Sequence, residues 1–302
     1  MEFRLDRLIT FSLMAPIAKL RSEPDISIPI LMYHSISDEQ ELGKHAYYRT
    51  NTRPRVFAEQ MGCLHENGYS SASVSDATLQ VKGDGLNPEK HVVITFDDGF
   101  ADFYRSALPV LARYRFQAIV YLPTAYIRDV RTQFKGKDCL TWDEVRELSR
   151  CGIQFGSHTV SHPQLRILSP AAIDEEILIS KNTIEDKLGC AVESFAYPYA
   201  FPQTDRDFKK MLRDSLERAG YQNGVCTIVG RVGHESDRFF LERLPISSAD
   251  DTALLEAKLA GAYDWIGKAQ ALAKRFKTQI GNFTSKKTRS MFSGTSDHAL
   301  YR

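Results

Sequence analysis

Two acidic residues, Asp97 and Asp98, stand side by side in the stretch TFDDGF (95–100). The apolar run HVVITF (91–96) leads into them and Gly99 follows, so the pair lies where a buried strand ends and a turn begins. An isolated pair of adjacent carboxylates is most often a solvated turn. Its meaning therefore depends on the polar residues that stand at the ends of the other predicted strands.

Two histidines, His158 and His162, are spaced four apart in SHTVSH (157–162). On one helical turn both imidazoles would lie on one face and could share a metal ion. With Asp98 they would make a set of two imidazoles and one carboxylate, which leaves coordination positions for water and substrate, as a catalytic site requires. Alone, the two histidines would be ordinary core or surface residues. Together with Asp98 they favour a divalent metal, with zinc as the usual ion for such ligands.

These residues need a scaffold that brings several strand ends together. Apolar runs that read as strands alternate with amphipathic helical segments, a pattern typical of parallel βαβ units. Seven strands are predicted in one series, at 28–34, 91–96, 117–123, 153–158, 194–198, 221–227 and 238–246. One continuous series favours a closed α/β barrel, in which functional groups sit at the C-terminal ends of strands. His34, at the end of the first strand, would then lie near Asp97, Asp98 and the histidine pair.

The chain has 302 residues and a net charge of +1, so no global field favours nucleic acid as a partner. We expect an amphipathic N-terminal extension over 1–27, a single barrel domain over 28–247, a basic helical extension over 248–283 and a disordered tail over 284–302. The N-terminal apolar run is too short to span a bilayer, which needs about 20 apolar residues. No clean export signal follows it, and the five scattered cysteines suit a reducing compartment, so the sequence predicts a cytoplasmic protein.

The motifs TFDDG, SHTVSH and FAYPYA, in this order, resemble those of the polysaccharide deacetylases with a NodB homology domain, carbohydrate esterase family 4. The resemblance covers residues 28 to 247 and implies a distorted (β/α) barrel, usually with seven strands. It also implies metal-dependent removal of N-acetyl groups from sugars. The first two motifs are highly specific and the third is a weaker match.

The resemblance assigns roles to matching positions. Asp97 takes the place of the general base, and Asp98, His158 and His162 take those of the metal ligands. The cation's charge would then make the neighbouring carboxylates tolerable, and the metal would polarise the amide carbonyl. The backbone N–H of Tyr199, just after Pro198, matches the family's oxyanion position.

Two departures from the family pattern affect the predicted base and acid. The Arg that usually pairs with the base is replaced by Ala196, and Arg243 near the last strand is the candidate to replace it. The late Leu-x-His motif that usually supplies the general acid is missing. The stretch LMYH, ending at His34, resembles the circularly permuted branch of the family, in which a first-strand His protonates the leaving amine as an imidazolium near neutral pH.

The leading hypothesis is a carbohydrate N-deacetylase acting on an N-acetylhexosamine in a polysaccharide or its lipid-linked precursor. A hydrolase of a small non-sugar amide and an inactive carbohydrate-binding relative are the alternatives. Apolar residues near the N-terminus and basic residues at 262–277 also predict peripheral contact with the inner membrane face. Packing of both segments against the underside of the barrel is the competing interpretation.

Overall fold

A parallel sheet of eight strands forms the centre of the computed structural model, which describes residues 4–20, 27–82 and 90–273. The strand order is β1-β12-β11-β10-β9-β6-β5-β4, and β1 also pairs with β5, so seven strands close into a barrel with β4 added beside β5. The strands are β1 (Ile30–Tyr33), β4 (Ser70–Ser71), β5 (His91–Phe96), β6 (Ile119–Leu122), β9 (Gln154–Ser157), β10 (Ser194–Ala196), β11 (Asn223–Val229) and β12 (Leu241–Pro245). The predicted barrel of seven parallel strands is confirmed.

Alternation along each strand decides which side chains face the barrel interior, because successive residues point to opposite faces. Along β5, Val92, Ile94 and Phe96 join the large core between the barrel and its helices. Val93 belongs to a second, smaller apolar cluster with residues from β1, β6, β10, β11 and β12. Asp97 continues the alternation of Val93 and therefore points into the barrel.

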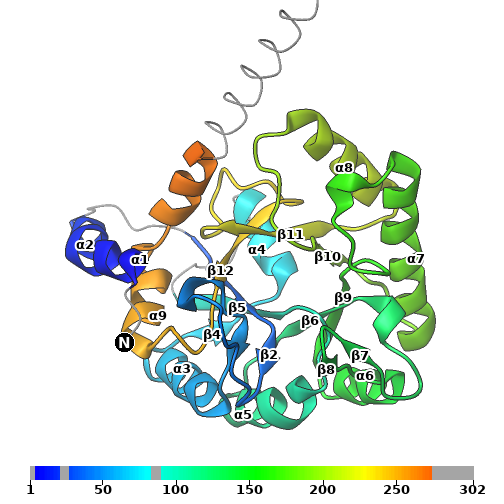
Figure 1. Ribbon diagram of the computed structural model, residues 1–302, viewed down its shortest axis with the longest axis horizontal. Coiled ribbons are helices and arrows are strands. Elements are labelled where there is room, and N and C mark those ends of the chain that lie inside the picture. The colour runs from blue at the N-terminus through cyan, green and yellow to red at the C-terminus, as the bar shows by residue number, and fades with distance from the viewer. Residues whose placement is uncertain (1–3, 21–26, 83–89, 274–302) are drawn as a thin grey trace, which may run out of the picture.

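Helices pack around the outside of the strands (Figure 1). They are α3 (Pro54–Glu66), α5 (Leu108–Tyr114), α6 (Trp142–Arg150), α7 (Pro170–Leu188), α8 (Arg206–Arg218) and α9 (Thr252–Leu259). A further helix, α4 (Val74–Lys82), lies across one end of the barrel, where Val74 and Ala77 join the interior cluster around Val93 (Figure 1). A capping box formed by Thr141 and Glu144 opens α6, and Ser169 caps α7. Both caps can be read in the sequence, and they mark where these two helices begin.

Some elements carry no clear pattern and were not predicted. They are α4, the short pair β2 (Ser35–Ile36) and β3 (Asn51–Thr52), and the antiparallel hairpin β7 (Gln133–Phe134) and β8 (Lys137–Asp138). In its described part, the helical extension predicted over 248–283 is not one helix, since α9 ends at Leu259 and residues 265–273 form a separate helix. Gly261 has φ +78, a left-handed conformation that ends helices.

The N-terminal segment is helical, as predicted, through α1 (Leu5–Ile9), a π-turn at Thr10–Met14 and α2 (Ala15–Lys19). It lies at the edge of the molecule beside the last helices (Figure 1). The predicted tail over 284–302 lies outside the described residues, and the predicted domain boundaries stay predictions. Among the described residues, no helix is both long enough and apolar enough to cross a membrane.

Candidate active site

The DDG turn separates the two acids that stand together in the sequence. Asp98 has φ 74 and Gly99 has φ 62, both in the left-handed region. A Cβ at position 99 would lie 2.9 Å from Leu122 Cδ2, so a larger residue in this left-handed turn would also have to displace that side-chain end. The left-handed turn directly after Asp97 lets its side chain stay inside the barrel while that of Asp98 meets the loop after β9.

His158 and His162 lie in this loop, and the prediction that they share a helical turn is wrong. Left-handed residues bend the loop instead, with φ 68 at Thr159 and φ 56 at His162. The Thr159 hydroxyl accepts a hydrogen bond of 2.9 Å from the His162 backbone N–H and so holds the bend. The imidazole rings meet with centroids 4.7 Å apart. The meeting of the two imidazoles was therefore anticipated from the residue types, but the backbone brings them together by another route.

Asp98, His158 and His162 form a buried set whose ligand atoms all lie within 4.8 Å of one another. Asp98 Oδ1 is 3.2 Å from His162 Nε2 and 3.7 Å from His158 Nε2. Ligands held about 2.0–2.2 Å from one ion are separated by distances of this size, so the set fits a divalent metal. Hydrogen bonding of His158 Nδ1 with the Ala196 carbonyl, at 2.8 Å, leaves Nε2 for the ion. Burial lowers the pKa of His158 to about 4, so its ring is neutral, as a ligand must be.

Arg243 lies beside Asp97 inside the barrel, where both side chains are buried. Its guanidinium donates to the two carboxylate oxygens in a fork, each at 2.7 Å. The same guanidinium donates to the Cys226 carbonyl and to Thr95 Oγ1, at 3.0 and 3.1 Å. Burial alone would raise the pKa of Asp97, but Arg243 and His158 outweigh it and lower the value to about 2. The contact expected of Arg243 is thus present, although its part in catalysis stays a prediction.

His34 leaves the end of β1 and is electrostatically coupled to Asp97, Asp98, Lys135 and Arg243. Burial lowers its pKa, and the two carboxylates offset this only in part. Its Nδ1 is buried and has no hydrogen-bond partner among the described residues. The predicted imidazolium near neutral pH is therefore disfavoured in the resting protein. The proton would have to be acquired during the reaction.

Tyr199 follows β10 with φ 60, and its half-exposed ring lies 4.7 Å from the ring of His162. Thr227 on β11, which the sequence analysis did not single out, fixes this loop. The Thr227 hydroxyl donates to the Tyr199 carbonyl at 2.9 Å and accepts from the Phe201 N–H at 3.0 Å. This pair of bonds holds the backbone at the predicted oxyanion position.

Lys135 also reaches the site, and the sequence analysis missed it. Its ammonium lies 3.0 and 3.3 Å from the Asp98 oxygens and 3.5 Å from His162 Nε2. Lys135 and Gly136 form the two-residue tip of the β7–β8 hairpin, with φ 52 and 77. Phe134, in the same hairpin, packs 5.1 Å from the His162 ring. Gly136 was the only feature of the sequence that could have indicated this hairpin turn. The flanking strands have two residues each, which is too short to show an alternating pattern.

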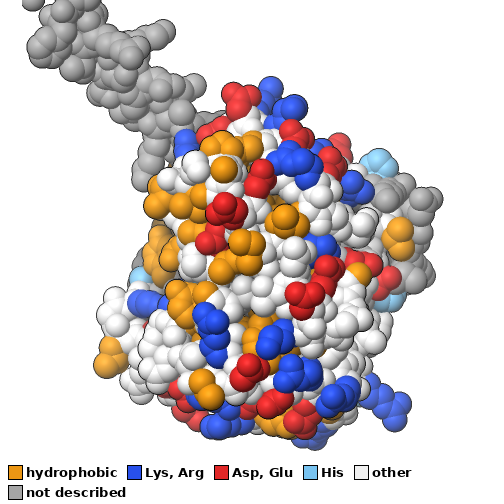
Figure 2. All heavy atoms as spheres, turned by 90° about the vertical axis from the view of Figure 1, so that its right-hand side faces the viewer, with side chains coloured by type: hydrophobic (Ala, Val, Ile, Leu, Met, Phe, Trp, Pro, Cys, Tyr) orange, Lys and Arg blue, Asp and Glu red, His pale blue; other side chains and the backbone are white. Residues whose placement is uncertain are grey.

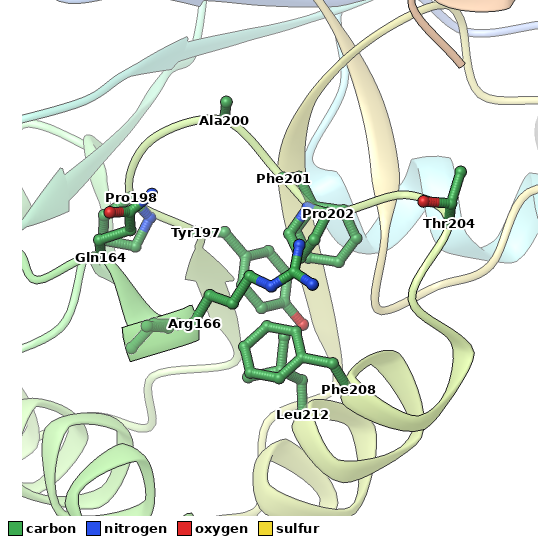
Figure 3. A pocket seen from close by; sticks show the side chains of 11 residues that line it. Gln164, Arg166, Tyr197, Pro198, Ala200, Phe201, Pro202, Thr204, Phe208 and Leu212 are labelled. Atoms are coloured by element: carbon green, nitrogen blue, oxygen red, sulfur yellow. The ribbon is translucent and has the colours of Figure 1, made fainter. Parts of the chain in front are cut away.

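A pocket of about 260 Å³ opens beside the site, between the loops that follow β9 and β10. Figure 3 shows Tyr197, Phe201 and Phe208 gathered around it, with Arg166 reaching in from the neighbouring loop. Arg166 forms an ion pair with Asp205 at 3.2 Å. The pocket thus combines aromatic walls with exposed polar groups, and it shares its loops with His162 and Tyr199.

Comparison with known sequences places this geometry in a family. The polysaccharide deacetylase profile matches residues 84–224. YxkH of Bacillus subtilis (strain 168), named as a polysaccharide deacetylase, is 30% identical over 230 residues, or 76% of this chain and 75% of YxkH. The poly-β-1,6-N-acetyl-D-glucosamine N-deacetylase of Escherichia coli (strain K12) is 32% identical over 139 residues, covering 43% of this chain and 20% of that longer enzyme.

Solved structures agree with the sequence comparison. The Streptococcus pyogenes deacetylase PplD, in complex with acetate, superposes with a TM-score of 0.67 and is 26% identical, covering 78% of this chain and 99% of PplD. IcaB from Ammonifex degensii shares the fold with a TM-score of 0.66 at 21% identity, covering 79% of this chain and 98% of IcaB. The strand-end carboxylates and histidines, the barrel that positions them and the match to YxkH all lead to one conclusion: this chain belongs to the polysaccharide deacetylase family.

Proposed function

We propose that the protein hydrolyses the acetamide of N-acetylglucosamine residues in a glycan, releasing acetate and leaving a free amine on the sugar. The observation that carries this proposal is the buried Asp97 beside the set of Asp98, His158 and His162. Relatives named as poly-β-1,6-N-acetyl-D-glucosamine N-deacetylases support a β-1,6-linked polymer as the substrate. A protein that only bound sugar would have no use for an ionised base beside a metal set.

The chain's own residues divide the work of amide hydrolysis. When bound to Asp98, His158 and His162, the metal would supply a Lewis acid for the amide carbonyl and for water. Asp97, held in one orientation by Arg243, accepts the proton of the attacking water. The Tyr199 backbone N–H donates to the oxygen that becomes negative as the tetrahedral carbon forms.

His34 donates the proton that the leaving nitrogen needs. Burial keeps its pKa below the usual range, while the adjacent carboxylates favour its protonated form. His34 can therefore donate only after it has gained a proton, and the proton that Asp97 accepts from the attacking water is the one that passes to it. Zinc is the ion that two imidazoles and one carboxylate most commonly hold, and it is the metal we propose.

The pocket beside the site favours a glycan over a small amide. The partly exposed ring of Phe208 suits the apolar face of a sugar ring, and the exposed Arg166 and Gln164 offer donors for hydroxyl groups. The pocket is partly open to solvent, as a binding site for a glycan chain must be. Pro198 and Ala200, on either side of Tyr199, belong to its lining. We therefore expect kcat/KM to rise when the substrate extends past one sugar.

The test is an assay of the metal-supplemented full chain on β-1,6-linked N-acetylglucosamine oligomers of increasing length. Acetate and free amine should appear in equal amounts, and a chelator should stop the reaction. Turnover of small N-acetyl amides without turnover of any oligomer would favour the small-amide hydrolase. Metal binding without release of amine from any substrate would favour the inactive relative.

Two variants and one control connect the activity to the site. His158→Ala should lose both metal and activity, while Asp97→Asn should keep the metal and lose roughly 10²–10⁴-fold in kcat. His234→Ala, an exposed histidine outside the site, should change neither. Equal loss of metal in Asp97→Asn and His158→Ala would contradict the separation of base from ligands.

A further inference from the structure

The N-terminal helical segment, residues 4–20, is turned the opposite way from most surface helices. Its polar residues Asp6 and Thr10 face the body of the protein and are only 8% and 0% exposed. The outward positions are apolar, and Leu8 and Leu13 keep 52% and 56% of their surface in solvent. The other large apolar side chains exposed on this segment are Leu5, Phe11, Ile17 and Leu20. A surface helix normally buries its apolar side, so this face calls for an apolar partner.

Polar contacts fix this orientation. The Tyr263 hydroxyl donates to Asp6 Oδ2 at 2.6 Å, and the Trp265 indole N–H donates to Thr10 Oγ1 at 3.2 Å. Arg4 donates to the Ala249 carbonyl at 2.7 Å and forms an ion pair with Asp250 at 3.2 Å. Rotation of the helix about its axis would break these buried contacts. The apolar side is therefore held outward by the fold itself.

We propose that this apolar face docks on the surface of an anionic lipid bilayer. Among the residues of 4–20 whose side chains the structure describes, Asp6 and Thr10 alone are buried, so most of the circumference of the segment is open to a partner. One flat protein partner would cover about half of the circumference at most, whereas a helix lying in the interfacial region of a bilayer meets apolar surroundings over a wide arc. Breadth of the apolar arc thus favours lipid over a second copy of the chain.

Charge supports the same occupant. Residues 8–18 carry no charged side chain, and the flanking sequence has the partly exposed Arg7 on one side and Lys19 and Arg21 on the other. Basic residues on both sides of an apolar run complement anionic headgroups. Lys268 is also exposed on the neighbouring helix, residues 265–273, where Leu272 adds to the apolar surface.

The opposite side of the molecule lacks this character. Figure 2 shows the side that carries α6, α7 and α8, where basic and acidic side chains are interspersed with apolar ones. Leu178 and Ile179 on α7 are 46% and 51% exposed, much like the outward leucines of the N-terminal segment. Asp174 and Glu175, one helical turn before them, are charged. Exposed leucines alone therefore do not make a docking face, and α7 supplies a matched control.

The docked helix would also set the position of the catalytic mouth. Asp250 and Asp251, which hold Arg4 and Arg7, follow β12 at its C-terminal end. This is the end of the barrel that carries Asp97 and the metal set. A bilayer that receives the apolar face would therefore lie beside the mouth, where a glycan attached to the membrane could enter.

The test is co-sedimentation of the full chain with vesicles of phosphatidylglycerol and phosphatidylcholine. Wild-type protein should bind, and the double variant Leu8→Asp/Leu13→Asp should bind about tenfold more weakly or not at all. The control variant Leu178→Asp/Ile179→Asp should bind as the wild type does. Deacetylation of a soluble oligomer should be equal in all three proteins, because none of the changed residues lies in the catalytic site.

Two results would overturn the proposal. Wild-type protein that sediments no better than the Leu8→Asp/Leu13→Asp variant has no lipid-docking face. A wild-type dimer in light scattering that becomes a monomer in this variant, without vesicle binding by either, would assign the face to a second copy. Both outcomes leave the deacetylase proposal intact, since its assay uses a soluble substrate.

Discussion

Asp97 and Asp98 are neighbours in the chain, yet different groups neutralise them. Asp97 faces the Arg243 guanidinium inside the barrel, and Asp98 faces His158, His162 and the Lys135 ammonium. In both cases burial would raise the pKa, but the charged partners lower it below the usual range of a carboxyl. Both acids are therefore ionised at neutral pH. A base with a pKa near 2 is a weak one, so Asp97 depends on a metal that makes the water more acidic.

Arg243→Met should destabilise the protein by about 3–5 kcal/mol at pH 7, because it leaves the Asp97 carboxylate buried without a cation. In the wild type, the pKa of Asp97 is lowered from 3.8 to about 2. A depressed carboxyl pKa contributes stability above its unfolded value, and this contribution is lost as the pH falls through the folded value. The difference in the free energy of unfolding between the wild type and Arg243→Met should therefore shrink by about 2 kcal/mol as the pH falls from 4 to 2. Urea unfolding across this range measures it.

Arg218→Met is the matched control for this prediction. Arg218 pairs with Asp174 at 2.8 Å on the surface between α8 and α7, where both side chains are about half exposed. Such pairs contribute about 0–1 kcal/mol, so the control should unfold almost as the wild type does. An Arg243→Met variant as stable as this control at pH 7 would show that the pair with Asp97 does not hold the barrel together.

Lys135 should oppose metal binding, because its ammonium lies against two of the three ligand side chains. A divalent ion in the set would meet this positive charge at close range. Lys135→Met should therefore bind zinc about tenfold more tightly or better, as measured by competition with a chromogenic chelator. The metal-free variant should also melt at a lower temperature, since Asp98 loses its ion pair.

Lys137→Met, in the same hairpin, serves as the comparison. Lys137 pairs with Glu39 and donates to Ser35 Oγ at 2.9 Å, away from the metal ligands. Its removal should leave the zinc affinity unchanged. Equal affinities in the wild type and in Lys135→Met would mean that Lys135 moves aside without cost when the metal enters.

At the scale of elements, the sequence predicted the strands and helices that have a periodic apolar pattern or a recognisable cap. Buried strands such as β5 and well-capped helices such as α6 and α7 were located from local patterns. The bend between His158 and His162 was not, because it depends on left-handed residues and a Thr159 hydrogen bond rather than on spacing. Thr227 was missed for a related reason, since its role is a contact between β11 and the loop after β10.

Thr227→Val should loosen the predicted oxyanion loop. The valine keeps the shape of the side chain but can neither donate to the Tyr199 carbonyl nor accept from the Phe201 N–H. We expect kcat to fall about tenfold or more with KM and zinc affinity little changed, because the loop donor acts on the transition state. Thr227→Ser, which keeps the hydroxyl, should retain most of the activity. Loss of zinc from Thr227→Val would instead point to a general disturbance of the site.

At the scale of the whole molecule, closure of the barrel explains contacts that join distant parts of the chain. The pairing of β1 with both β12 and β5 brings the last strand beside the first, so Arg243 reaches Asp97 across 146 positions of sequence. The segments outside the barrel meet for the same reason, since α1 precedes β1 and α9 follows β12. Local sequence patterns predict each strand, but they do not predict these long-range contacts, because the contacts depend on closure of the barrel.

The contact between the N-terminal helix and the segment that follows β12 should open without unfolding the barrel. Arg4 joins Asp6, Ala249 and Asp250 at one place, so Arg4→Met should release the N-terminal helix. Hydrogen exchange should then become about tenfold faster or more at residues 5–19, while the barrel strands keep their protection and the melting temperature changes little. Arg7→Met, which removes a more exposed pair with Asp251, should cause a smaller change. If Arg4→Met instead weakens protection in the barrel strands as much as in the helix, the N-terminal segment is part of the cooperative core, and the barrel needs both of its ends to fold.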